Sequence, residues 1–398
     1  MKKRTIAKTG ATMLTMAMLL NGTTVFAADS SYAGVKGGST TFDKYLVMDQ
    51  EANVPNASFT YTIAPGTAKI YDVDNKKVEV LAGVGTPTMT DEDTEKAGCQ
   101  LVFKPTDTLN KTLQTGDQVK SFDASKQGYA KKTSTVDFSG VTFTEPGIYR
   151  YVITETGTNQ AVTNDTNDKR YLDVYVTDEN GTLKVSGYIL HATDSEVGMK
   201  DSQGSDGEQT DYKSQGFTNT YDTSNLTFKK EVSGNQASRD KFFEFTVEIK
   251  DAVPGTVYNV DITGATATSG SNAATIKANA NQTNVTELTV EADGKVTQKF
   301  YLQHDQCIKI QGIAKDSTYT VTENKEDYKS EAAAVEDYKD PTTGTVASTD
   351  LKTSYLNTRA GVIPTGVIMT VAPFAAVTLL GAAGMVTIKM RKKEDDAE

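Results

Sequence analysis

Residues 226–234 read Leu-Thr-Phe-Lys-Lys-Glu-Val-Ser-Gly, a short segment in which apolar and polar side chains alternate. Successive side chains of a β-strand point to opposite faces, so Leu226 and Phe228 share one face of this segment. The same alternation puts Lys230 on that apolar face and Lys229 on the opposite one. The segment therefore predicts a β-strand that carries a lysine on its buried side.

Short segments of this kind, rich in Thr, Val, Tyr and Phe, dominate the middle of the chain, where we find no long segment with helical periodicity. Clusters of Gly, Asn and Asp separate them, and residues 178–181 are typical of a hairpin turn. The pattern predicts an all-β fold of antiparallel β-sandwiches. We expect loops at residues 193–215 and in part of residues 64–135. The predicted strands include residues 59–63, 149–153, 171–176, 243–249 and 319–321.

The same order of strands occurs twice, which predicts two tandem domains, at residues 28–222 and 223–361. Each copy opens on a strand with a lysine, contains a later strand that ends in Thr-Glu, and closes on a strand with an asparagine. In both copies an aromatic residue follows the lysine by fifteen positions, at Phe59 and Phe245.

Six polar residues of these repeated strands fall on the more apolar face of their strand. A buried lone charge is costly, so it must be neutralised, paired or consumed. Taken singly, each could be an edge-strand residue whose charged head reaches water, or an asparagine in a turn. Two sets that match in residue type and order favour a shared role instead. The sets are Lys44, Glu155 and Asn219 in the first copy, and Lys230, Glu323 and Asn357 in the second.

A lysine, a glutamic acid and an asparagine that meet in one core can form a bond between side chains. Burial lowers the pKa of the lysine, which gives a neutral amine. Burial raises the pKa of the glutamic acid, which can then donate to the asparagine carbonyl and shuttle protons. The amine attacks that carbonyl, ammonia leaves, and a Lys–Asn isopeptide bond remains. We therefore expect each set to consume its own buried charge.

Residues 1–27 are typical of a secretory signal peptide. A basic start is followed by the apolar residues 11–20 and then by Val-Phe-Ala at residues 25–27, a site for signal peptidase. The apolar segment is too short for the alternative, a membrane anchor. We expect the mature chain to begin at Ala28.

The C-terminal residues 362–398 have three parts. Val-Ile-Pro-Thr-Gly at residues 362–366 precedes a nearly uncharged segment at 367–388, long enough to span a bilayer, and a basic tail follows. A plain transmembrane anchor is the alternative. The arrangement resembles the cell-wall sorting signal of Gram-positive surface proteins, with Val-Ile in place of the usual Leu. The resemblance implies that a sortase thiolate attacks the Thr365 carbonyl and that Gly366 leaves.

The chain as a whole resembles the Gram-positive backbone pilins of the two-domain, streptococcal T-antigen type. The most specific stretches are residues 135–156, 216–234, 319–330 and 364–373. The resemblance implies two tandem immunoglobulin-like, CnaB-type sandwiches, each with one self-formed isopeptide bond promoted by a glutamate. It implies a Lys44–Asn219 bond promoted by Glu155 and a Lys230–Asn357 bond promoted by Glu323.

Polymerisation of such pilins needs a further, exposed lysine that reaches the sortase-bound Thr365 of another subunit. The Tyr-Pro-Lys-Asn motif of many backbone pilins is missing from this sequence, and Glu155-Thr156-Gly157 departs from the family's proline-containing Glu box. The resemblance implies a lysine shortly before the last strand of the first domain. Lys213 fits best and Lys200 is the reserve, while a solvated lysine without a role is the alternative for either.

Composition narrows the remaining function classes. The 398 residues contain 41 Lys and Arg against 52 Asp and Glu, a net charge of −11, which argues against nucleic acid as a partner. Two His and two Cys leave little material for a multi-His metal site or a disulfide framework, and we interpret Cys99 and Cys307 as buried free thiols. The acidic segments 72–75 and 164–168 lack EF-hand spacing and are interpreted as solvated turns. We expect neither a metal nor a cofactor.

These observations predict the shaft subunit of a covalent pilus, secreted and linked to the cell wall of a Gram-positive bacterium. It is not a turnover enzyme, because each isopeptide site acts once on its own chain. The expected partners are other copies of the chain, a class C-type pilin sortase, minor pilins and peptidoglycan. The first alternative is a non-polymerising, wall-anchored adhesin or minor pilin. A surface hydrolase is the second, and it would need a catalytic site beyond the two sets.

Overall fold

The computed structural model describes most of residues 32–361, namely 32–73, 75–91, 99–195, 197, 202–203, 209–210, 214, 216–264 and 285–361. These residues form strands and turns only, so the predicted all-β fold is confirmed for them. None of the described residues forms a helix that could cross a membrane. The predicted signal peptide, Thr365, Gly366, the segment 367–388, Lys200 and Lys213 lie outside the described residues.

The first sandwich is built from the strands β1 to β16. One sheet has the order β13-β12-β10-β3-β7, with a hairpin of β4 and β5 joined to β10, and the other has the order β11-β16-β2-β8-β6. Two small sheets pair β1 with β9 and β14 with β15. The bounds are β1 (Val35–Lys36), β2 (Ser39–Asp49), β3 (Ala57–Pro65), β4 (Lys69–Val73), β5 (Lys76–Ala82), β6 (Thr88–Asp91), β7 (Cys99–Phe103), β8 (Gln127–Asp137), β9 (Thr142–Phe143), β10 (Gly147–Thr156), β11 (Val162–Thr163), β12 (Lys169–Glu179), β13 (Thr182–His191), β14 (Ser202–Gln203), β15 (Gln209–Thr210) and β16 (Gly216–Tyr221).

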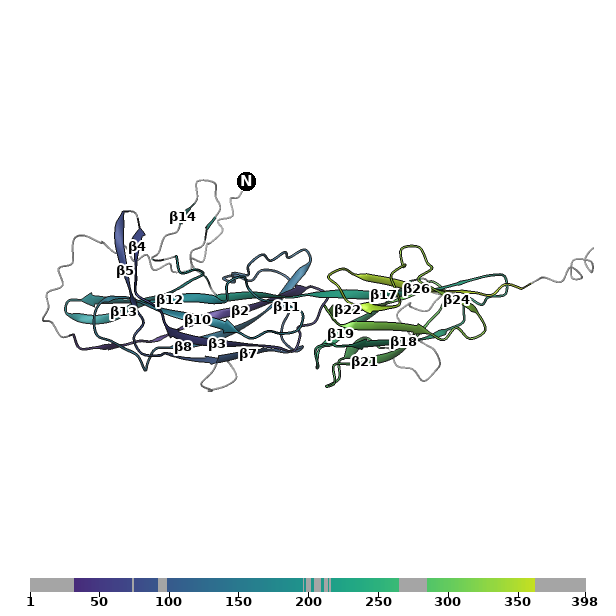
Figure 1. The fold of residues 1–398 in the computed structure, drawn as a ribbon, viewed down its shortest axis with the longest axis horizontal. Helices are drawn as coiled ribbons and strands as arrows, with labels where there is room; N and C mark the ends of the chain where they lie inside the picture. Colours follow the sequence, from purple (N-terminus) through teal and green to yellow (C-terminus); the bar gives the residue numbers. More distant parts are fainter. Residues whose placement is uncertain are drawn as a thin grey trace, which may run out of the picture.

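The second sandwich follows with two further sheets. Their strand orders are β20-β19-β22-β17-β26-β24 and β21-β18-β23-β25. The two sandwiches lie end to end along the long axis of the molecule, the second in green and yellow (Figure 1). The bounds are β17 (Thr223–Ser233), β18 (Phe243–Lys250), β19 (Val257–Gly264), β20 (Glu287–Thr289), β21 (Val296–Leu302), β22 (Gln306–Ala314), β23 (Thr318–Glu323), β24 (Lys329–Ala332), β25 (Thr343–Thr345) and β26 (Leu351–Thr358).

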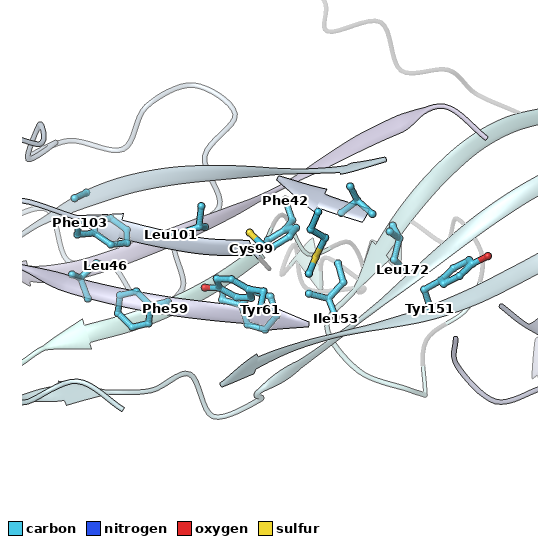
Figure 2. Close-up of a cluster of buried hydrophobic side chains, with 14 of the residues drawn as sticks. Phe42, Leu46, Phe59, Tyr61, Cys99, Leu101, Phe103, Tyr151, Ile153 and Leu172 are labelled. Carbon is cyan, nitrogen blue, oxygen red and sulfur yellow. The ribbon is translucent and has the colours of Figure 1, made fainter. Parts of the chain in front are cut away.

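Alternation of side chains along the strands builds both cores. On β18 the residues Phe243, Phe245, Val247 and Ile249 are buried, and those between them are partly exposed. Burial of each such side chain stabilises the fold by roughly 1.5–3 kcal/mol. Figure 2 shows part of the corresponding cluster in the first sandwich, which includes Phe42, Leu46, Phe59, Tyr61, Leu101, Phe103, Ile153 and Leu172.

The first long strand and the last strand of each sandwich are parallel neighbours. In the first sandwich β2 pairs with β16, and in the second β17 pairs with β26. Parallel strands cannot be joined by a tight hairpin, so each pair brings together residues far apart in the sequence. This topology positions the candidate sites.

The expectation of loops in part of residues 64–135 is confirmed for residues 104–126, which belong to no named strand, but strands make up much of the rest of the segment. It contains the strands β4, β5, β6 and β7 and the start of β8. The hairpin of β4 and β5 buries Tyr71, while β6 and β7 contribute Met89 and Leu101 to the core. Strands of four to seven residues leave too short an alternation to be recognised in a polar sequence. The predicted hairpin at residues 178–181 is confirmed, since Asn180 and Gly181 both have positive φ and connect β12 to β13.

The junction between the sandwiches is short and contains specific contacts. Only Asp222 separates β16 from β17. Across the junction, Asn53 Nδ2 donates hydrogen bonds to the Asn259 Oδ1 at 2.9 Å and to a backbone carbonyl at 3.0 Å. Gly312 has φ +74°, and a Cβ there would lie 2.8 Å from the Ala52 Cα, so a glycine permits the close approach.

Candidate functional site

The first candidate site lies between the two sheets of the first sandwich. Lys44 on β2 and Asn219 on β16 come from the parallel pair, with Asn219 opposite Leu46 in the register. Glu155 on β10 reaches them from the facing sheet. Its Oε2 lies 2.6 Å from the Lys44 Nζ, and its Oε1 accepts a hydrogen bond of 2.6 Å from the Asn219 Nδ2. Glu155 therefore contacts both of the other residues predicted from the sequence.

Burial controls the protonation of this site. Lys44 and Asn219 are fully buried, and the Glu155 side chain is 4% exposed. Loss of hydration lowers the pKa of Lys44 to about 8, although the adjacent Glu155 acts in the opposite direction. The ammonium lies 4.2 Å from the centre of the Phe59 ring, and the Tyr61 hydroxyl donates to Glu155 Oε2 at 2.6 Å. A neutral amine is therefore accessible near neutral pH.

The second candidate site repeats this arrangement in the second sandwich. Lys230 on β17 and Asn357 on β26 come from the parallel pair, and Asn357 is opposite Val232, the same offset of two positions as in the first site. Glu323 on β23 lies in the facing sheet. Its Oε1 is 2.6 Å from the Lys230 Nζ and accepts from the Asn357 Nδ2 at 3.1 Å. The Ser330 hydroxyl donates to Glu323 Oε2 at 2.8 Å.

The environment of Lys230 matches that of the first lysine. The Lys230 and Glu323 side chains are fully buried. Burial lowers the pKa of Lys230 to about 8, against the effect of Glu323. The ammonium lies 4.4 Å from the centre of the Phe243 ring. Lys229 points to the other face, where it pairs with Asp305 at 2.6 Å and is 20% exposed.

The spacing of fifteen residues does not mark equivalent aromatic positions. Phe243, not Phe245, lies beside Lys230 as Phe59 lies beside Lys44. Phe245 is opposite Glu323 in the register, the place that Tyr61 holds opposite Glu155 in the first sandwich. The lysine and its aromatic neighbour are Lys44 and Phe59 in the first sandwich and Lys230 and Phe243 in the second, so the spacing is two residues shorter in the second.

The amide group of Asn219 has a defined orientation. The backbone N–H of Asp165 donates to its Oδ1 at 2.9 Å, and a backbone N–H can only donate. The Nδ2 consequently faces Glu155 and also donates to Asn164 Oδ1 at 3.0 Å. The expected donation from the glutamic acid to the asparagine carbonyl is therefore wrong for this site. Glu155 faces the amide nitrogen, the group that would leave as ammonia.

The second site lacks such a donor. Among the described residues, the Asn357 Oδ1 is buried and has no hydrogen-bond partner. Its amide nitrogen is also farther from the glutamate than in the first site, 3.1 Å against 2.6 Å. The two sites thus share a distance of 2.6 Å between lysine and glutamate. They differ around the asparagine, and also in the carboxylate: the lysine and asparagine contact different oxygens of Glu155 but the same oxygen, Oε1, of Glu323.

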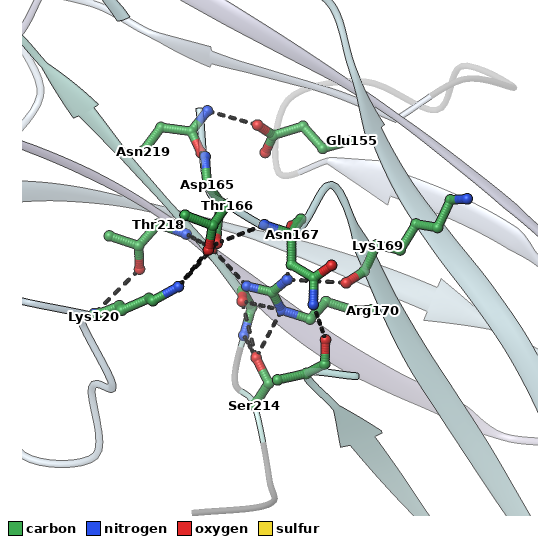
Figure 3. Close-up of polar contacts among 12 residues, drawn as sticks. Lys120, Glu155, Asp165, Thr166, Asn167, Lys169, Arg170, Ser214, Thr218 and Asn219 are labelled. Atoms are coloured by element: carbon green, nitrogen blue, oxygen red, sulfur yellow. Dashed lines mark hydrogen bonds and ion pairs between the residues drawn. The ribbon is translucent and has the colours of Figure 1, made fainter. Parts of the chain in front are cut away.

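Sequence analysis missed Asp165 and Arg170, which lie next to the first site (Figure 3). The Asp165 side chain is only 2% exposed and accepts a hydrogen bond of 2.6 Å from Arg170 Nη2. The interpretation of residues 164–168 as a solvated turn is therefore wrong for Asp165. An acidic residue near an arginine in the sequence is a weak signal, and only the fold shows that both are buried beside Asn219.

The same three residue types meet a third time, at the junction between the sandwiches. Glu51 Oε2 lies 2.5 Å from the Lys309 Nζ and accepts from Asn225 Nδ2 at 3.1 Å. The Lys309 and Glu51 side chains are 27% and 40% exposed, so water screens and solvates the pair. This set lacks the desolvation that distinguishes the other two.

The remaining sequence-based interpretations concern Cys and His. Cys99 and Cys307 are buried free thiols, as predicted. His191 is buried, with its Nε2 3.1 Å from Asp173 Oδ2, and the His304 Nδ1 accepts from the Val232 N–H at 3.0 Å. Within the described residues, no three His, Cys, Asp or Glu side chains cluster as a metal site would require.

Comparison with known proteins adds independent findings. Residues 44–222 match the family described as a Spy0128-like isopeptide containing domain, and residues 224–359 match a domain of unknown function, DUF7601. A curated pilin from Streptococcus pyogenes serotype M1 is 26% identical over 411 aligned residues, which cover 98% of this chain and 99% of that protein.

Solved structures of pilins are similar as well. The crystal structure of the major pilin from S. pyogenes is 21% identical, with a TM-score of 0.48, and the alignment covers 82% of this chain and all of that one. The major pilin T3.2 from the same species is 19% identical, with a TM-score of 0.48. The alignment covers 82% of this chain and 99% of that one. The similarity to the Spy0128-like isopeptide containing domain thus covers the first sandwich.

Proposed function

We propose that the chain is the structural shaft subunit of a covalent pilus on a Gram-positive cell surface, stabilised by two self-formed Lys–Asn isopeptide bonds. The observation that carries the proposal is the repeated set of a buried lysine, glutamate and asparagine, each joining the first long strand of a sandwich to its last. The similarity to a curated pilin over nearly the whole chain supports the same function.

Each site has the groups that the bond-forming reaction requires. A proton moves from the Lys44 ammonium to Glu155, which leaves a neutral amine and a neutral acid. The Nζ attacks the Asn219 Cγ, and a C–N bond forms. The proton on the glutamic acid then passes to the Nδ2, the old C–N bond breaks, and one ammonia leaves. The Glu155 carboxylate then takes a proton from the nitrogen of the new bond. Glu155 therefore ends the reaction as a neutral acid.

The same steps apply to Lys230, Asn357 and Glu323 in the second sandwich. Each reaction turns a buried ammonium into a neutral amide, so the cost of desolvating that charge disappears from the folded state. The domain division at residues 222 and 223 belongs to this proposal, because each domain then contains one complete set.

Assembly between subunits follows from the sequence outside the described residues. A pilin sortase would cleave after Thr365 and join its carbonyl to an amine of the next subunit, with Lys213 as the acceptor and Lys200 as the reserve. The predicted secretion signal and the basic tail support a location at the cell wall, with peptidoglycan and minor pilins as the further proposed partners. The chain is then a substrate of the sortase and acts on itself only once per site.

A blot of wall extracts tests this function. Extracts of the producing cell are boiled in SDS and probed for the protein. We expect a ladder of very large species, and we expect a Lys213→Ala strain to lose it. A Lys169→Ala strain, which changes a lysine of β12, is the control and should keep the ladder. A ladder that survives Lys213→Ala moves the linkage to Lys200. A single band near the size of the monomer contradicts the shaft function and favours a wall-anchored adhesin.

A further inference from the structure

The oxygen of the Asn219 amide is held by a backbone donor. When an amine attacks an amide, negative charge develops on this oxygen in the tetrahedral intermediate. The Asp165 N–H already lies 2.9 Å from it, the distance of a good hydrogen bond. Because Glu155 occupies the nitrogen side of the amide, the backbone N–H is the group placed on the oxygen side.

The position of this N–H is fixed by the side chain of its own residue. Asp165 Oδ2 accepts from the Thr218 N–H at 3.0 Å, which ties the turn to the strand that carries Asn219. The Asp165 Oδ1 accepts from the Asn167 N–H at 3.2 Å. Burial alone raises the pKa of Asp165, but the Thr218 N–H and the charge of Arg170 outweigh it and hold the pKa below its usual range. The carboxylate is therefore ionised and fully engaged.

Arg170 in turn fixes the carboxylate. This residue is 4% exposed and lies on β12, with its guanidinium carbon 4.5 Å from the centre of the Phe217 ring. Besides Asp165, it donates to the carbonyls of Gly216 at 2.7 Å and Asn167 at 2.9 Å (Figure 3). A buried ion pair is often no more stabilising than an apolar pair, so stability alone does not explain this network.

We propose that the Asp165 N–H stabilises the oxyanion that forms on Asn219 when Lys44 attacks, and that Arg170 is a positioning residue that holds this N–H in place. The inference rests on the proposed isopeptide function and deepens it. As the Nζ–Cγ bond forms, the electron pair of the C=O bond moves to Oδ1 and is held by the N–H. It returns as the bond to Nδ2 breaks, and ammonia leaves with the proton delivered by Glu155.

The second site provides an internal reference. Among the described residues, no donor reaches the Asn357 oxygen, although its lysine and glutamate also lie 2.6 Å apart. The proposal therefore predicts that the Lys44–Asn219 bond forms faster than the Lys230–Asn357 bond. Removal of a single oxyanion donor from an enzyme slows it by about 100-fold to 1,000-fold, which sets the scale of the expected difference.

The test follows both bonds in the same molecules. Residues 28–365, the proposed mature chain, are made by cell-free synthesis, aliquots are quenched in acid, and proteolytic peptides that contain each bond are quantified by mass spectrometry. An α-hydroxy acid analogue of aspartate at position 165 replaces the N–H with an oxygen and keeps the carboxylate. We expect the Lys44–Asn219 bond to form about 100-fold more slowly, with the second bond unaffected. The same replacement at Thr166 is the matched control and leaves both rates unchanged.

Two side-chain variants test the positioning residue. Arg170→Gln should slow the first bond about tenfold, and Arg170→Lys, which keeps a charge beside Asp165, should restore part of the rate. The pH profile separates this effect from a change at Lys44, whose surroundings include Glu155, Asp165 and Arg170. Loss of positioning lowers the rate by the same factor at every pH, whereas loss of the Arg170 charge acting directly on Lys44 shifts the profile along the pH axis.

The outcomes distinguish this inference from the function on which it rests. If neither bond forms in the unaltered chain, the proposed isopeptide function itself is wrong. If both bonds form but the ester at position 165 leaves the first rate unchanged, the oxyanion donor is wrong and the isopeptide function stands. If an altered chain shows no bond at Lys44, its susceptibility to protease distinguishes failure of the first sandwich to fold from a slow reaction. The ester variant at position 165 then decides whether the N–H is the oxyanion donor.

Discussion

The two sandwiches hold the same three residues in the same register but surround them differently. In both, the lysine and glutamate lie 2.6 Å apart, and burial lowers the pKa of the lysine to about 8. Around the asparagine, the first site has a backbone donor on the amide oxygen and the second has none among the described residues. The contact between lysine and glutamate is what the proposed bond formation requires. The surroundings of the asparagine differ, and they can set the rate of that reaction.

The exposed set at the junction sharpens this comparison. Lys309, Glu51 and Asn225 bring the same three residue types into contact without burying them fully. Their lysine and carboxylate remain partly in water, where an ion pair is stable and a neutral amine is not favoured. Desolvation is therefore the feature that distinguishes the two proposed cross-linking sites from this salt bridge.

The sandwiches also differ in where a pulling force would enter. If subunits are joined through Lys213 and Thr365, the chain from Lys213 to Lys230 runs directly through β16 and β17. The load then crosses the second sandwich through the Lys230–Asn357 bond. The Lys44–Asn219 bond lies beside this path, not within it. The second bond would carry the load, and the first would stabilise a sandwich attached to the side of the path.

The largest expected effect is mechanical. A single molecule pulled between residue 213 and residue 361 should not lengthen when both bonds are present. Glu323→Ala should allow the second sandwich to unfold, with a gain in length on the order of 400 Å for the chain that the bond encloses. Glu155→Ala, the matched variant, should give no such gain. Equal extension of the two variants in force spectroscopy contradicts the difference between the bonds.

The next effect is on stability. Lys44→Met and Lys230→Met each remove one bond without leaving a buried ammonium, and loop closure of this size contributes about 5 kcal/mol by the entropy model of cross-links. For domains of this size, the loss corresponds to a fall of roughly 10–20 °C in Tm. Calorimetry measures it, and Lys229→Met on the exposed face is the control, with a change within about 1 kcal/mol. If all three variants melt alike, the bonds do not stabilise the fold.

A smaller effect concerns pH. Asn219→Ala leaves the ion pair of Lys44 and Glu155 without a bond to form. The pKa of Lys44 in the folded state is about 8 against an ordinary value of 10.5, so above pH 8 the unfolded chain binds more protons than the folded one. Stability should therefore rise with pH, by about 2 kcal/mol between pH 8 and 9.5.

Urea unfolding of this variant measures the rise. Asn219→Ala combined with Lys44→Met is the reference and should lack it, because no buried amine remains to titrate. The unaltered chain should lack it as well, since its amine is consumed in an amide. If the free energy of unfolding depends on pH in the same way in the single and the double variant, the single variant does not contain a buried, unbonded lysine.

The smallest effect is expected at the junction. Lys309→Met removes a partly exposed ion pair, which is worth at most about 1 kcal/mol. The mass of the chain should change only by the substitution itself, because no third ammonia has been lost. A third bond, detected as a further mass deficit that Lys309→Met restores, would overturn the conclusion that desolvation selects the reacting sets.

Much of the fold and the core of each site could be predicted from the sequence. The alternation of side chains in a strand is local, so it places Lys230 inside and Lys229 outside from a few residues alone. The repeat then identifies which lysine, glutamate and asparagine correspond in the two copies. The short strands β5, β6 and β7 escaped prediction because each pairs with a strand distant in the sequence, namely β10, β8 and β3.

The surroundings of the sites were beyond sequence analysis for a different reason. The donor to Asn219 is a backbone group of Asp165, 54 residues away, and every residue except proline offers the same N–H. The orientation of the amide depends on this contact, and the sequence carries no mark of it. The spacing between the lysine and its aromatic neighbour is likewise two residues shorter in the second sandwich, a difference that the residue types do not reveal.

The mass of the purified protein tests the central claim most directly. Residues 28–365 are expressed, folded, and measured intact by mass spectrometry under denaturing conditions. We predict a mass about 34 Da below that of the sequence, one ammonia for each of two bonds, with Glu155→Ala and Glu323→Ala each restoring one loss. A folded protein with the full mass of its sequence would contradict the account.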